Sequence, residues 1–305
     1  MEPLIIVKSP FSQRHDTGAG HAECYARIEG LDTVLSPYPY VMAPAAEYDV
    51  IALAHEEDYI DSIMMAVPED GLRALSDGDT VLSPDSYEAA LHAAGAGCHG
   101  VDLLIDKRAR RVFCPIRPPG HHAEADKAMG FCIFNNAFIA ARYAQEQHDI
   151  SRIAIVDFDV HHGNGTQNMS MAHNRKNADR PIFYASSHVR DLFPHTGDPS
   201  DNSDYLVNVH LKHGAGGDVF YSAYVEKILP ALNAFKPELL IISAGFDAHK
   251  DDPLGLCGLE ADDFSWLTTK LCAAVSCSVL SILEGGYNIE ALKKSVECHV
   301  KSLCA

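Results

Sequence analysis

Four short apolar runs, each ending at or directly followed by a polar residue, constrain the fold of this chain more than any other feature. They span residues 111–116, 153–157, 239–243 and 279–283. Their length and their content of β-branched residues are typical of buried strands. Segments with an apolar stripe at helical spacing lie between or after them, at residues 136–146, 218–235 and 261–275. Strands that alternate with helices predict an α/β fold, with a central, mostly parallel sheet between two layers of helices.

The polar residues that stand out in the sequence follow the predicted strands. In open parallel sheets, ligands bind at the carboxyl ends of the strands. Four strand ends, after Ile116, Val156, Ser243 and Leu283, should therefore contribute to one site. We find no internal repeat, low-complexity tract or long linker, so we expect residues 1–305 to form one catalytic domain. The Asp- and Gly-rich segment 68–84 is predicted to be an exposed loop near the substrate.

Composition narrows the class of protein. Hydrophobic residues make up 47% of the chain, which is enough for a large core. No apolar run reaches the roughly 20 residues that a membrane helix needs. The N-terminus lacks a basic segment followed by an apolar block, so we expect a cytoplasmic protein without a membrane partner. The nine cysteines include no C-x-x-C pair, which argues against a disulfide framework and a thiolate zinc site.

The formal net charge of −18 disfavours direct binding to nucleic acid, because phosphates would be repelled. Its sign suits a cationic substrate such as lysine or a polyamine, although it also serves plain solubility. The match of residues 95–100 to G-x-G-x-x-G does not predict a dinucleotide site, because the preceding residues 84–94 already have a helical pattern. Close packing of small residues between helices accounts for it better.

A carboxylate and an imidazole two residues apart, Asp159 and His161, close the strand that begins at Arg152. Strand alternation would turn both toward one ion, with Asp157 just behind. Asp247, at another strand end, adds a second carboxylate. This set suits a divalent cation such as zinc and leaves one coordination position for water. Taken singly, each residue is more often a helix cap, an ion-pair partner or a surface histidine.

Two adjacent histidines, His121 and His122, follow Pro118, Pro119 and Gly120, which restrict the backbone. Two neighbouring imidazoles are not both easily charged, so one can stay neutral and accept a proton from water while the other stabilises charge. Asp157 and Asn164 are available to orient them. A rigid surface loop with incidental histidines is the alternative interpretation.

A tyrosine after paired glycines, Tyr287 after Gly285 and Gly286, could donate its hydroxyl to an oxyanion. By itself this pattern is more often a turn with a packed aromatic ring. Together with the segments above it resembles the histone deacetylase family, of class II type. The resemblance rests on residues 15–21, 117–136, 156–167, 244–254 and 283–288.

The resemblance implies an arginase/deacetylase-like fold with one zinc ion per chain at the base of a narrow tunnel. It implies that the metal ligands are Asp159, His161 and Asp247. His122 is similar to the family's general base and acid, and His121 is similar to its electrostatic partner. Asp157 and Asn164 are similar to the residues that orient these two histidines. Tyr287 is similar to the residue that polarises the scissile carbonyl. The tunnel residues implied in the same way are Gly130, Phe131, Phe193 and Leu254, which follows Asp252-Pro253. Asp79 is implied at the rim, where it would bind backbone amides of the substrate. Family members also bind structural potassium, which would lie near Asp157, Asp159, His161 and Ser186.

One departure concerns the first loop. Family members often have Pro-Glu-Arg-Pro-x-Arg after the N-terminal histidine, where this chain has Ala22-Glu23-Cys24-Tyr25-Ala26-Arg27. The departure bears on the tunnel rim and leaves the metal site untouched.

The resemblance therefore predicts a zinc-dependent amidohydrolase that removes acetyl groups from lysine side chains of proteins or peptides. An acetylpolyamine deacetylase would use the same chemistry. A two-manganese ureohydrolase would need more bridging carboxylates, and a module that binds acetyl-lysine without cleaving it would not need the catalytic residues.

Overall fold

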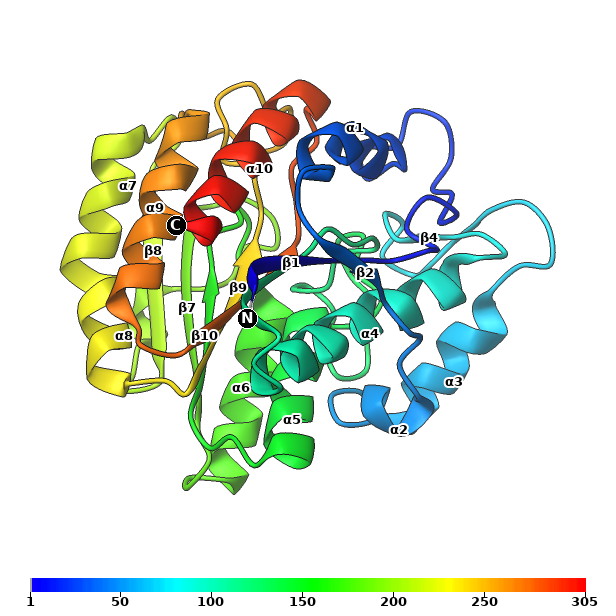
Figure 1. The fold of residues 1–305 in the computed structure, drawn as a ribbon. Coiled ribbons are helices and arrows are strands. Elements are labelled where there is room, and N and C mark those ends of the chain that lie inside the picture. The colour runs from blue at the N-terminus through cyan, green and yellow to red at the C-terminus, as the bar shows by residue number, and fades with distance from the viewer. Residues whose placement is uncertain (1) are drawn as a thin grey trace.

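The computed structural model describes residues 2–305. Its centre is an eight-stranded sheet with the order β2-β1-β5-β10-β9-β6-β7-β8, and every strand pairing in it is parallel (Figure 1). The strands are β1 (Glu2–Lys8), β2 (Tyr40–Met42), β5 (Ala109–Cys114), β6 (Ile153–Asp157), β7 (Ile182–Val189), β8 (Leu206–Leu211), β9 (Leu239–Ala244) and β10 (Ser278–Leu283). The predicted α/β class is confirmed.

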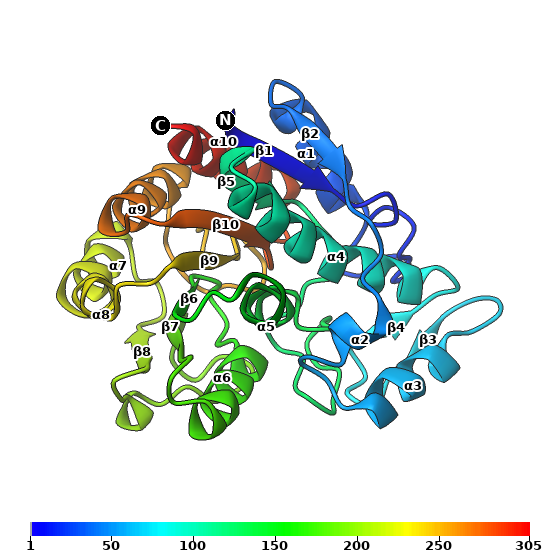
Figure 2. The same cartoon turned by 60° about the horizontal axis from the view of Figure 1, so that its bottom comes forward.

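Helices cover both faces of this sheet (Figure 2). One face packs against α1 (Ala26–Leu35), α7 (Gly217–Ala223), the π-helical turn η2 (Tyr224–Ile228), α8 (Leu229–Phe235), α9 (Ala261–Ala274) and α10 (Ile289–Cys304). The other face packs against α4 (Ser86–Ile105), α5 (Asn136–His148) and α6 (Asn164–Lys176). Buried aliphatic and aromatic side chains fill both interfaces, and the central strands β6, β7 and β9 are buried along their whole length, as is typical of a parallel sheet.

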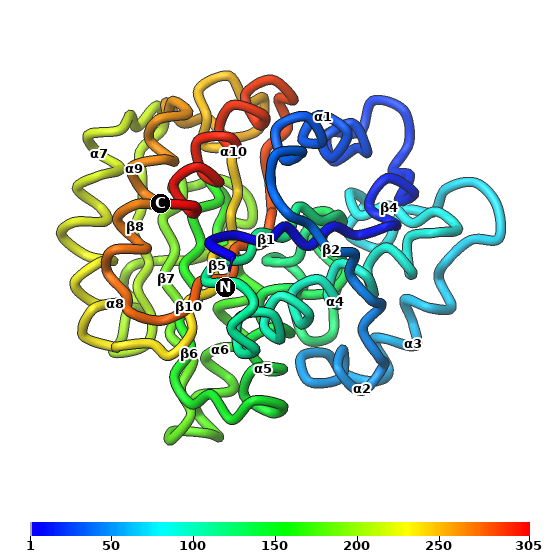
Figure 3. The backbone as a smooth tube through the Cα atoms, viewed as in Figure 1, coloured from blue at the N-terminus to red at the C-terminus, as the bar shows by residue number. Residues whose placement is uncertain are grey.

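The remaining elements lie beside α4. They are α2 (Tyr48–Ile51), α3 (Glu57–Ala66) and a two-stranded antiparallel hairpin of β3 (Arg73–Ala74) and β4 (Val81–Leu82). A short 3₁₀ helix, η1 (Pro199–Asp201), precedes β8. The hairpin falls within segment 68–84, so this loop has more regular structure than its composition predicts. Near the two ends of the chain, β1 and α10 pack against each other (Figure 3).

The small residues of segment 95–100 lie inside α4, as the sequence predicts. A methyl group on Gly100 would come within 2.7 Å of Leu280, and one on Gly97 within 3.1 Å of Ala140. These glycines let α4 pack closely on the sheet and on α5, so helix packing explains the pattern. The nine cysteines of the chain are all free. No helix within residues 2–305 is both long and apolar enough to cross a membrane.

Candidate active site

The carboxyl ends of four adjacent strands, β5, β10, β9 and β6, meet at one edge of the sheet because all of their pairings are parallel. The loops that leave these ends carry the polar residues that the sequence analysis selected. Two helices begin directly after such loops. The side chain of Asn135 caps α5 by accepting from the N–H of Phe138 at 3.0 Å, and that of Asn288 caps α10 by accepting from Ala291 at 3.1 Å. Each cap fixes where a site loop ends.

The predicted metal ligands converge, but for a different local reason than strand alternation. β6 ends at Asp157, so Asp159 and His161 lie beyond it in a turn. In this turn the carboxylate of Asp157 accepts the N–H of Asp159 at 3.1 Å, and that of Asp159 accepts the N–H of His161 at 2.9 Å. Side-chain hydrogen bonds two residues along the chain are a common way to fold Asp-containing loops. They, and not the pleat of a strand, turn the two side chains toward Asp247.

Asp159, His161 and Asp247 form a buried group that could hold a metal ion. Nδ1 of His161 lies 3.0 Å from Oδ1 of Asp159 and 3.1 Å from Oδ2 of Asp247. In a tetrahedron with bonds of about 2.1 Å, neighbouring ligand atoms are roughly 3.4 Å apart, so these side chains fit zinc with little adjustment. The other carboxylate oxygens are used by backbone N–H groups. Gly285 donates to Asp159 at 2.8 Å, and Val160 donates to Asp247 at 2.9 Å.

The electrostatics of this group also suit a cation. Burial, together with the neighbouring carboxylate of Asp159, raises the pKa of Asp247 to about 7. Burial acts in the same direction on Asp159, but His121 and His161 outweigh it and hold the pKa of that carboxyl below its ordinary value. The negative charges of Asp159 and Asp247 are thus only partly balanced by the neighbouring histidines. A divalent ion would supply the missing positive charge.

Two glycines allow the backbone to approach these carboxylates. A methyl group on Gly245 would lie 2.0 Å from Oδ2 of Asp159, and one on Gly285 would lie 2.1 Å from Oδ2 of Asp247. No side chain fits at either position. The glycines of the two strand-end sequences therefore have a steric role at the site.

Each of the tandem histidines contacts the orienting partner that the sequence analysis named. Nδ1 of His121 lies 3.0 Å from the carboxylate of Asp157, and Nδ1 of His122 lies 2.9 Å from Oδ1 of Asn164. The hydroxyl of Tyr184 also donates to Asp157, at 2.9 Å. The centroids of the two imidazole rings are 4.0 Å apart. Both side chains are almost completely buried, so they do not belong to an incidental surface loop.

The two imidazoles have opposite protonation tendencies. Burial lowers the pKa of His121, but Asp157 and Asp159 outweigh it and raise that pKa to about 10. Burial, His121 and His161 lower the pKa of His122 well below its ordinary value. Because neighbouring groups with separated pKa values mark an acid–base pair, His121 is the charged member and His122 the neutral one.

A cavity of about 270 Å³ opens above the metal-binding group. Every residue predicted to bind substrate lies in its wall. The lining residues are Asp79, His122, Gly130, Phe131, His161, Leu192, Phe193, Leu254 and Tyr287. Gly130 has no room for a side chain, because a methyl group there would lie 2.6 Å from His122 and 2.8 Å from Phe193. The ring of Phe193 in turn packs edge-on against His122.

The cavity rim is held by contacts that the sequence analysis did not identify. Asp77 accepts from the backbone and hydroxyl of Thr80 and from the N–H of Gly130, at 3.1, 2.7 and 3.2 Å. His21 lies 3.2 Å from the carbonyl oxygen of Asp79, and its ring packs edge-on against Phe131. Asp77 and His21 thus join segment 68–84 and the first loop to the wall of the cavity.

A buried ion cluster supports Tyr287 from behind and was also missed. Arg27 donates through Nε to the carbonyl oxygen of Gly286 at 2.6 Å and through Nη2 to that of Glu284, and its guanidinium lies 5.0 Å from the centre of the Tyr287 ring. Glu23 lies between Arg27, 3.0 Å away, and Arg117. Glu23 and Arg27 are four residues apart, a spacing that could have suggested an ion pair. Glu23 and Arg27 stand where the family pattern Pro-Glu-Arg-Pro-x-Arg also has Glu and Arg, so the departures at Ala22, Cys24 and Tyr25 leave this ion pair in place.

Other features lie near the site without forming part of the predicted set. His121, Cys132 and Glu284 make a second buried group with metal-ligand atoms close together. Ser186 is paired with Asp157 across β6 and β7, where the resemblance implies potassium, and potassium binding stays a prediction.

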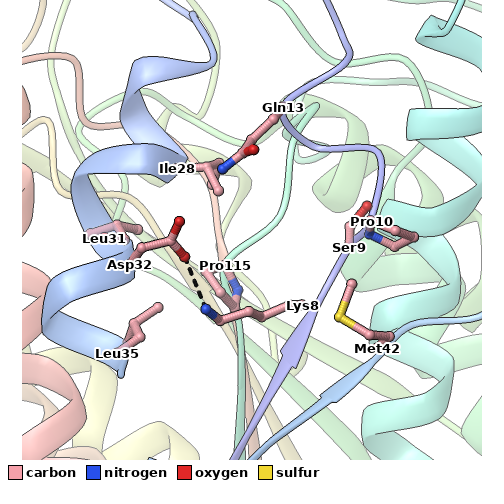
Figure 4. A pocket seen from close by; sticks show the side chains of 10 residues that line it. All are labelled: Lys8, Ser9, Pro10, Gln13, Ile28, Leu31, Asp32, Leu35, Met42 and Pro115. Atoms are coloured by element: carbon pink, nitrogen blue, oxygen red, sulfur yellow. Dashed lines mark hydrogen bonds and ion pairs between the residues drawn. The ribbon is translucent and has the colours of Figure 1, made fainter. Parts of the chain in front are cut away.

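A separate hollow of about 210 Å³ lies between α1 and the ends of β1 and β2 (Figure 4). Lys8 and Asp32 form an ion pair across it at 2.9 Å, and none of the predicted site residues line it. Of these two hollows, the one above Asp159, His161 and Asp247 gathers the predicted site residues.

Comparisons with known proteins agree with this geometry. A model of the histone deacetylase domain matches residues 21–303. The chain is 38% identical to an uncharacterized protein of Synechocystis sp., slr0245, over 98% of the chain and 99% of that protein. It is 36% identical to histone deacetylase 14, chloroplastic, of Arabidopsis thaliana, over 93% of the chain and 73% of that protein.

Some relatives are much longer than this chain. Type-2 histone deacetylase 2 of Dictyostelium discoideum is 39% identical over 74% of the chain, but the match spans only 14% of that protein. Among solved structures, the crystal structure of the HDA15 HD domain is similar over 100% of this chain and 90% of its own length, with a TM-score of 0.90 and 29% identity.

Proposed function

The chain belongs to the histone deacetylase family and is a hydrolase of deacetylase type, and from this premise we propose that it is a zinc-dependent lysine deacetylase. Its reaction would be hydrolysis of the amide of an N-acetylated lysine side chain to acetate and the free amine. One observation carries the proposal. Asp159, His161 and Asp247 form a buried metal-binding group, and His161 lines the same cavity as His122 and Tyr287.

A bound zinc ion would polarise the amide carbonyl and lower the pKa of a water molecule beside it. The remaining groups are supplied by the chain. His122 is neutral, and its contact with Asn164 through Nδ1 leaves Nε2 to accept the proton of the attacking water. His121, charged and paired with Asp157, offsets the negative charge that develops nearby.

Tyr287 is suited to stabilise the oxyanion of the tetrahedral intermediate. Burial and the carboxylates of Asp247 and Asp159 raise the pKa of Tyr287 well above its ordinary value, so its hydroxyl stays protonated and able to donate. His122 then returns the proton to the leaving amine.

Two observations support a lysine side chain as substrate over an acetylated polyamine. A polyamine carries further ammonium groups, which a buried or nearby acid would recognise. Leu254, an apolar residue, lies in the cavity wall after Asp252-Pro253. The carboxylate of Asp252 is occupied by the backbone N–H groups of Leu254, Tyr287 and Asn288 at 3.0, 2.6 and 3.2 Å. Both of its oxygen atoms therefore already accept backbone hydrogen bonds.

Turnover of purified, metal-analysed protein on an acetyl-lysine peptide and on acetylspermidine tests the proposal. We expect the peptide to have the higher kcat/KM, and we expect His122→Ala to lose turnover while retaining zinc. A preference for acetylspermidine would favour the acetylpolyamine alternative. Absence of turnover on both substrates, with zinc bound, would contradict the proposed function.

A further inference from the structure

Glu284 is a fully buried acid beside the site that the proposed mechanism does not use. It follows the last residue of β10. Its Oε2 accepts the backbone N–H groups of Gly120 and His121, at 2.7 and 3.2 Å. Its Oε1 accepts the hydroxyl of Ser243, at the end of β9, at 3.2 Å. One carboxylate thus joins three strand ends.

The loop that carries the tandem histidines is held on its carbonyl side by other residues. Asn136 donates to the carbonyl oxygen of Pro118 at 3.1 Å, and the N–H of Thr166 donates to that of His121 at 3.1 Å. On the N–H side, Pro118 and Pro119 have no donor to offer. Gly120 and His121 supply the N–H groups immediately before His122, and Glu284 accepts both.

The histidine loop is packed too closely against neighbouring backbone for the N–H groups of Gly120 and His121 to reach another acceptor by a small shift. A methyl group on Gly120 would already lie 2.5 Å from the backbone nitrogen of Asn136 and 2.8 Å from the carbonyl oxygen of Phe134. Without the Glu284 carboxylate, two buried N–H groups would lose their acceptor, and the loop would have to shift to satisfy them.

Glu284 also immediately precedes the Gly285-Gly286 turn that presents Tyr287. Its own carbonyl oxygen accepts from Arg27, the residue whose guanidinium lies over the Tyr287 ring. The same residue is therefore tied to the histidine loop through its side chain and to the tyrosine turn through its backbone.

We propose that Glu284 is a positioning residue, which fixes the distance between the His121–His122 pair and Tyr287 by binding two backbone N–H groups of the histidine loop. The inference rests on the proposed function, because it assigns no chemical step to Glu284 itself. Misplacement of catalytic groups by about 1 Å costs roughly 100-fold in rate, so loss of this link should lower kcat more than it raises KM.

Three substitutions distinguish the effect of the length of the Glu284 side chain from the effect of its charge. Glu284→Gln keeps the length and an acceptor oxygen but removes the charge. Glu284→Asp keeps the charge but is shorter by one methylene group and cannot reach both N–H groups. Glu284→Ala removes both properties. Ser243→Ala is the matched control, because it removes one hydrogen bond to Glu284 and leaves the histidine loop untouched.

The experiment is measurement of kcat, KM and bound zinc for the full chain and these four variants on the substrate that the wild-type protein turns over best. We expect Glu284→Gln and Ser243→Ala to keep kcat within about threefold of wild type, and Glu284→Asp and Glu284→Ala to lose about 10- to 100-fold, with KM and zinc content little changed. If Glu284→Ala does not fold, the comparison of the Gln and Asp variants decides alone.

Two results would overturn the inference: wild-type kcat in Glu284→Asp, or a loss in Glu284→Gln as large as that in Glu284→Asp. Either would mean that charge or mere bulk matters instead of the two hydrogen bonds. An inactive wild-type protein would contradict the proposed function instead, so the two failures are distinguishable.

Discussion

Two clusters of buried charge lie close to each other behind the cavity, and they differ in how their charges are balanced. In the first, Glu23 is enclosed by two guanidinium groups, those of Arg27 and Arg117. In the second, Asp159 and Asp247 have one imidazole, His161, between them. The side chains of both clusters are nearly or completely removed from solvent. In the first cluster, called the complete cluster below, the cations outnumber the acid. In the second, called the incomplete cluster, two carboxylates share one imidazole, and a cation from outside would balance them.

The pKa shifts of the acids express the same difference. Burial opposes ionisation of Glu23, but Arg117 and Arg27 outweigh it and lower its pKa to about 2. Burial and Asp159 together raise the pKa of Asp247 to about 7. A buried acid whose charge is balanced by neighbouring cations can stabilise the fold. A buried acid whose charge is not balanced is a candidate for ligand binding and catalysis.

Substitution in the incomplete cluster should abolish activity without harming the fold. In Asp247→Asn, Oδ1 can still accept from Val160, the repulsion between the two carboxylates disappears, and a metal ligand is lost. We expect turnover to fall by at least about 1000-fold, roughly 4 kcal/mol of transition-state stabilisation, with unchanged or raised stability of the metal-free protein. Steady-state kinetics and urea unfolding measure the two effects, with the exposed Asp32→Asn as control. If Asp247→Asn retained turnover, the claim that the incomplete cluster binds the catalytic metal would be contradicted.

Substitution in the complete cluster should have the opposite consequence. Arg117→Met would leave Glu23 with one guanidinium partner and deprive the carbonyl oxygens of Ser12 and His15 of their donor. We expect the free energy of unfolding to fall by about 3–5 kcal/mol, because one partner of a buried ion cluster is lost. Urea denaturation measures this change. The double variant with Glu23→Leu should recover part of the loss, and a change below about 1 kcal/mol in the single variant would contradict the account.

Acid should weaken the complete cluster in a defined pH range. The folded-state pKa of Glu23 is about 2 and its ordinary value is 4.5, so the carboxylate contributes stability above pH 4.5 and loses it as the pH falls toward 2. The full contribution is on the order of 3 kcal/mol. The difference in unfolding free energy between wild type and Glu23→Gln should therefore shrink steadily below pH 4.5. A difference that is the same at pH 6 and pH 3 would show that the pKa of Glu23 is the same in the folded and the unfolded protein.

The smallest effect on stability is expected for an ion pair at the surface. Lys8 and Asp32 lie 2.9 Å apart, but their side chains are 24% and 51% exposed, so water screens the interaction (Figure 4). Lys8→Met should change the unfolding free energy by less than about 1 kcal/mol. Thermal unfolding with the wild type as reference measures it. A larger effect would mean that proximity alone, without burial, determines the strength of charge pairs in this protein.

The sequence predicted one of these clusters and not the other, for a physical reason. Asp159, His161 and Asp247 follow apolar strands, and the carboxyl ends of parallel strands are bound to meet, so strand prediction alone brings the residues together. The same logic located His121, His122 and Tyr287. Strand limits were also close: β6 begins and ends where the apolar run does, β9 and β10 differ from the predicted runs by one residue, and β5 begins and ends two residues earlier than its run.

Glu23, Arg27 and Glu284 gave no comparable signal. Glu23 and Arg27 come from the first loop and the start of α1, and their partners besides each other are backbone carbonyl groups and a residue 94 positions away. Hydrogen bonds to backbone atoms leave no trace in the identity of the partner residue. Glu284 was noted only as part of the Gly-Gly-Tyr segment, because its role depends on the N–H groups of a loop 164 residues distant.

Zinc binding by the wild-type protein and by Asp247→Asn tests the central claim most directly. Equilibrium dialysis followed by elemental analysis should find one zinc ion per wild-type chain, none in the variant, and activity that returns in proportion to the zinc restored. Two metal ions per active chain, or full activity in a preparation free of divalent metal, would contradict the claim that Asp159, His161 and Asp247 bind the single ion on which the reaction depends.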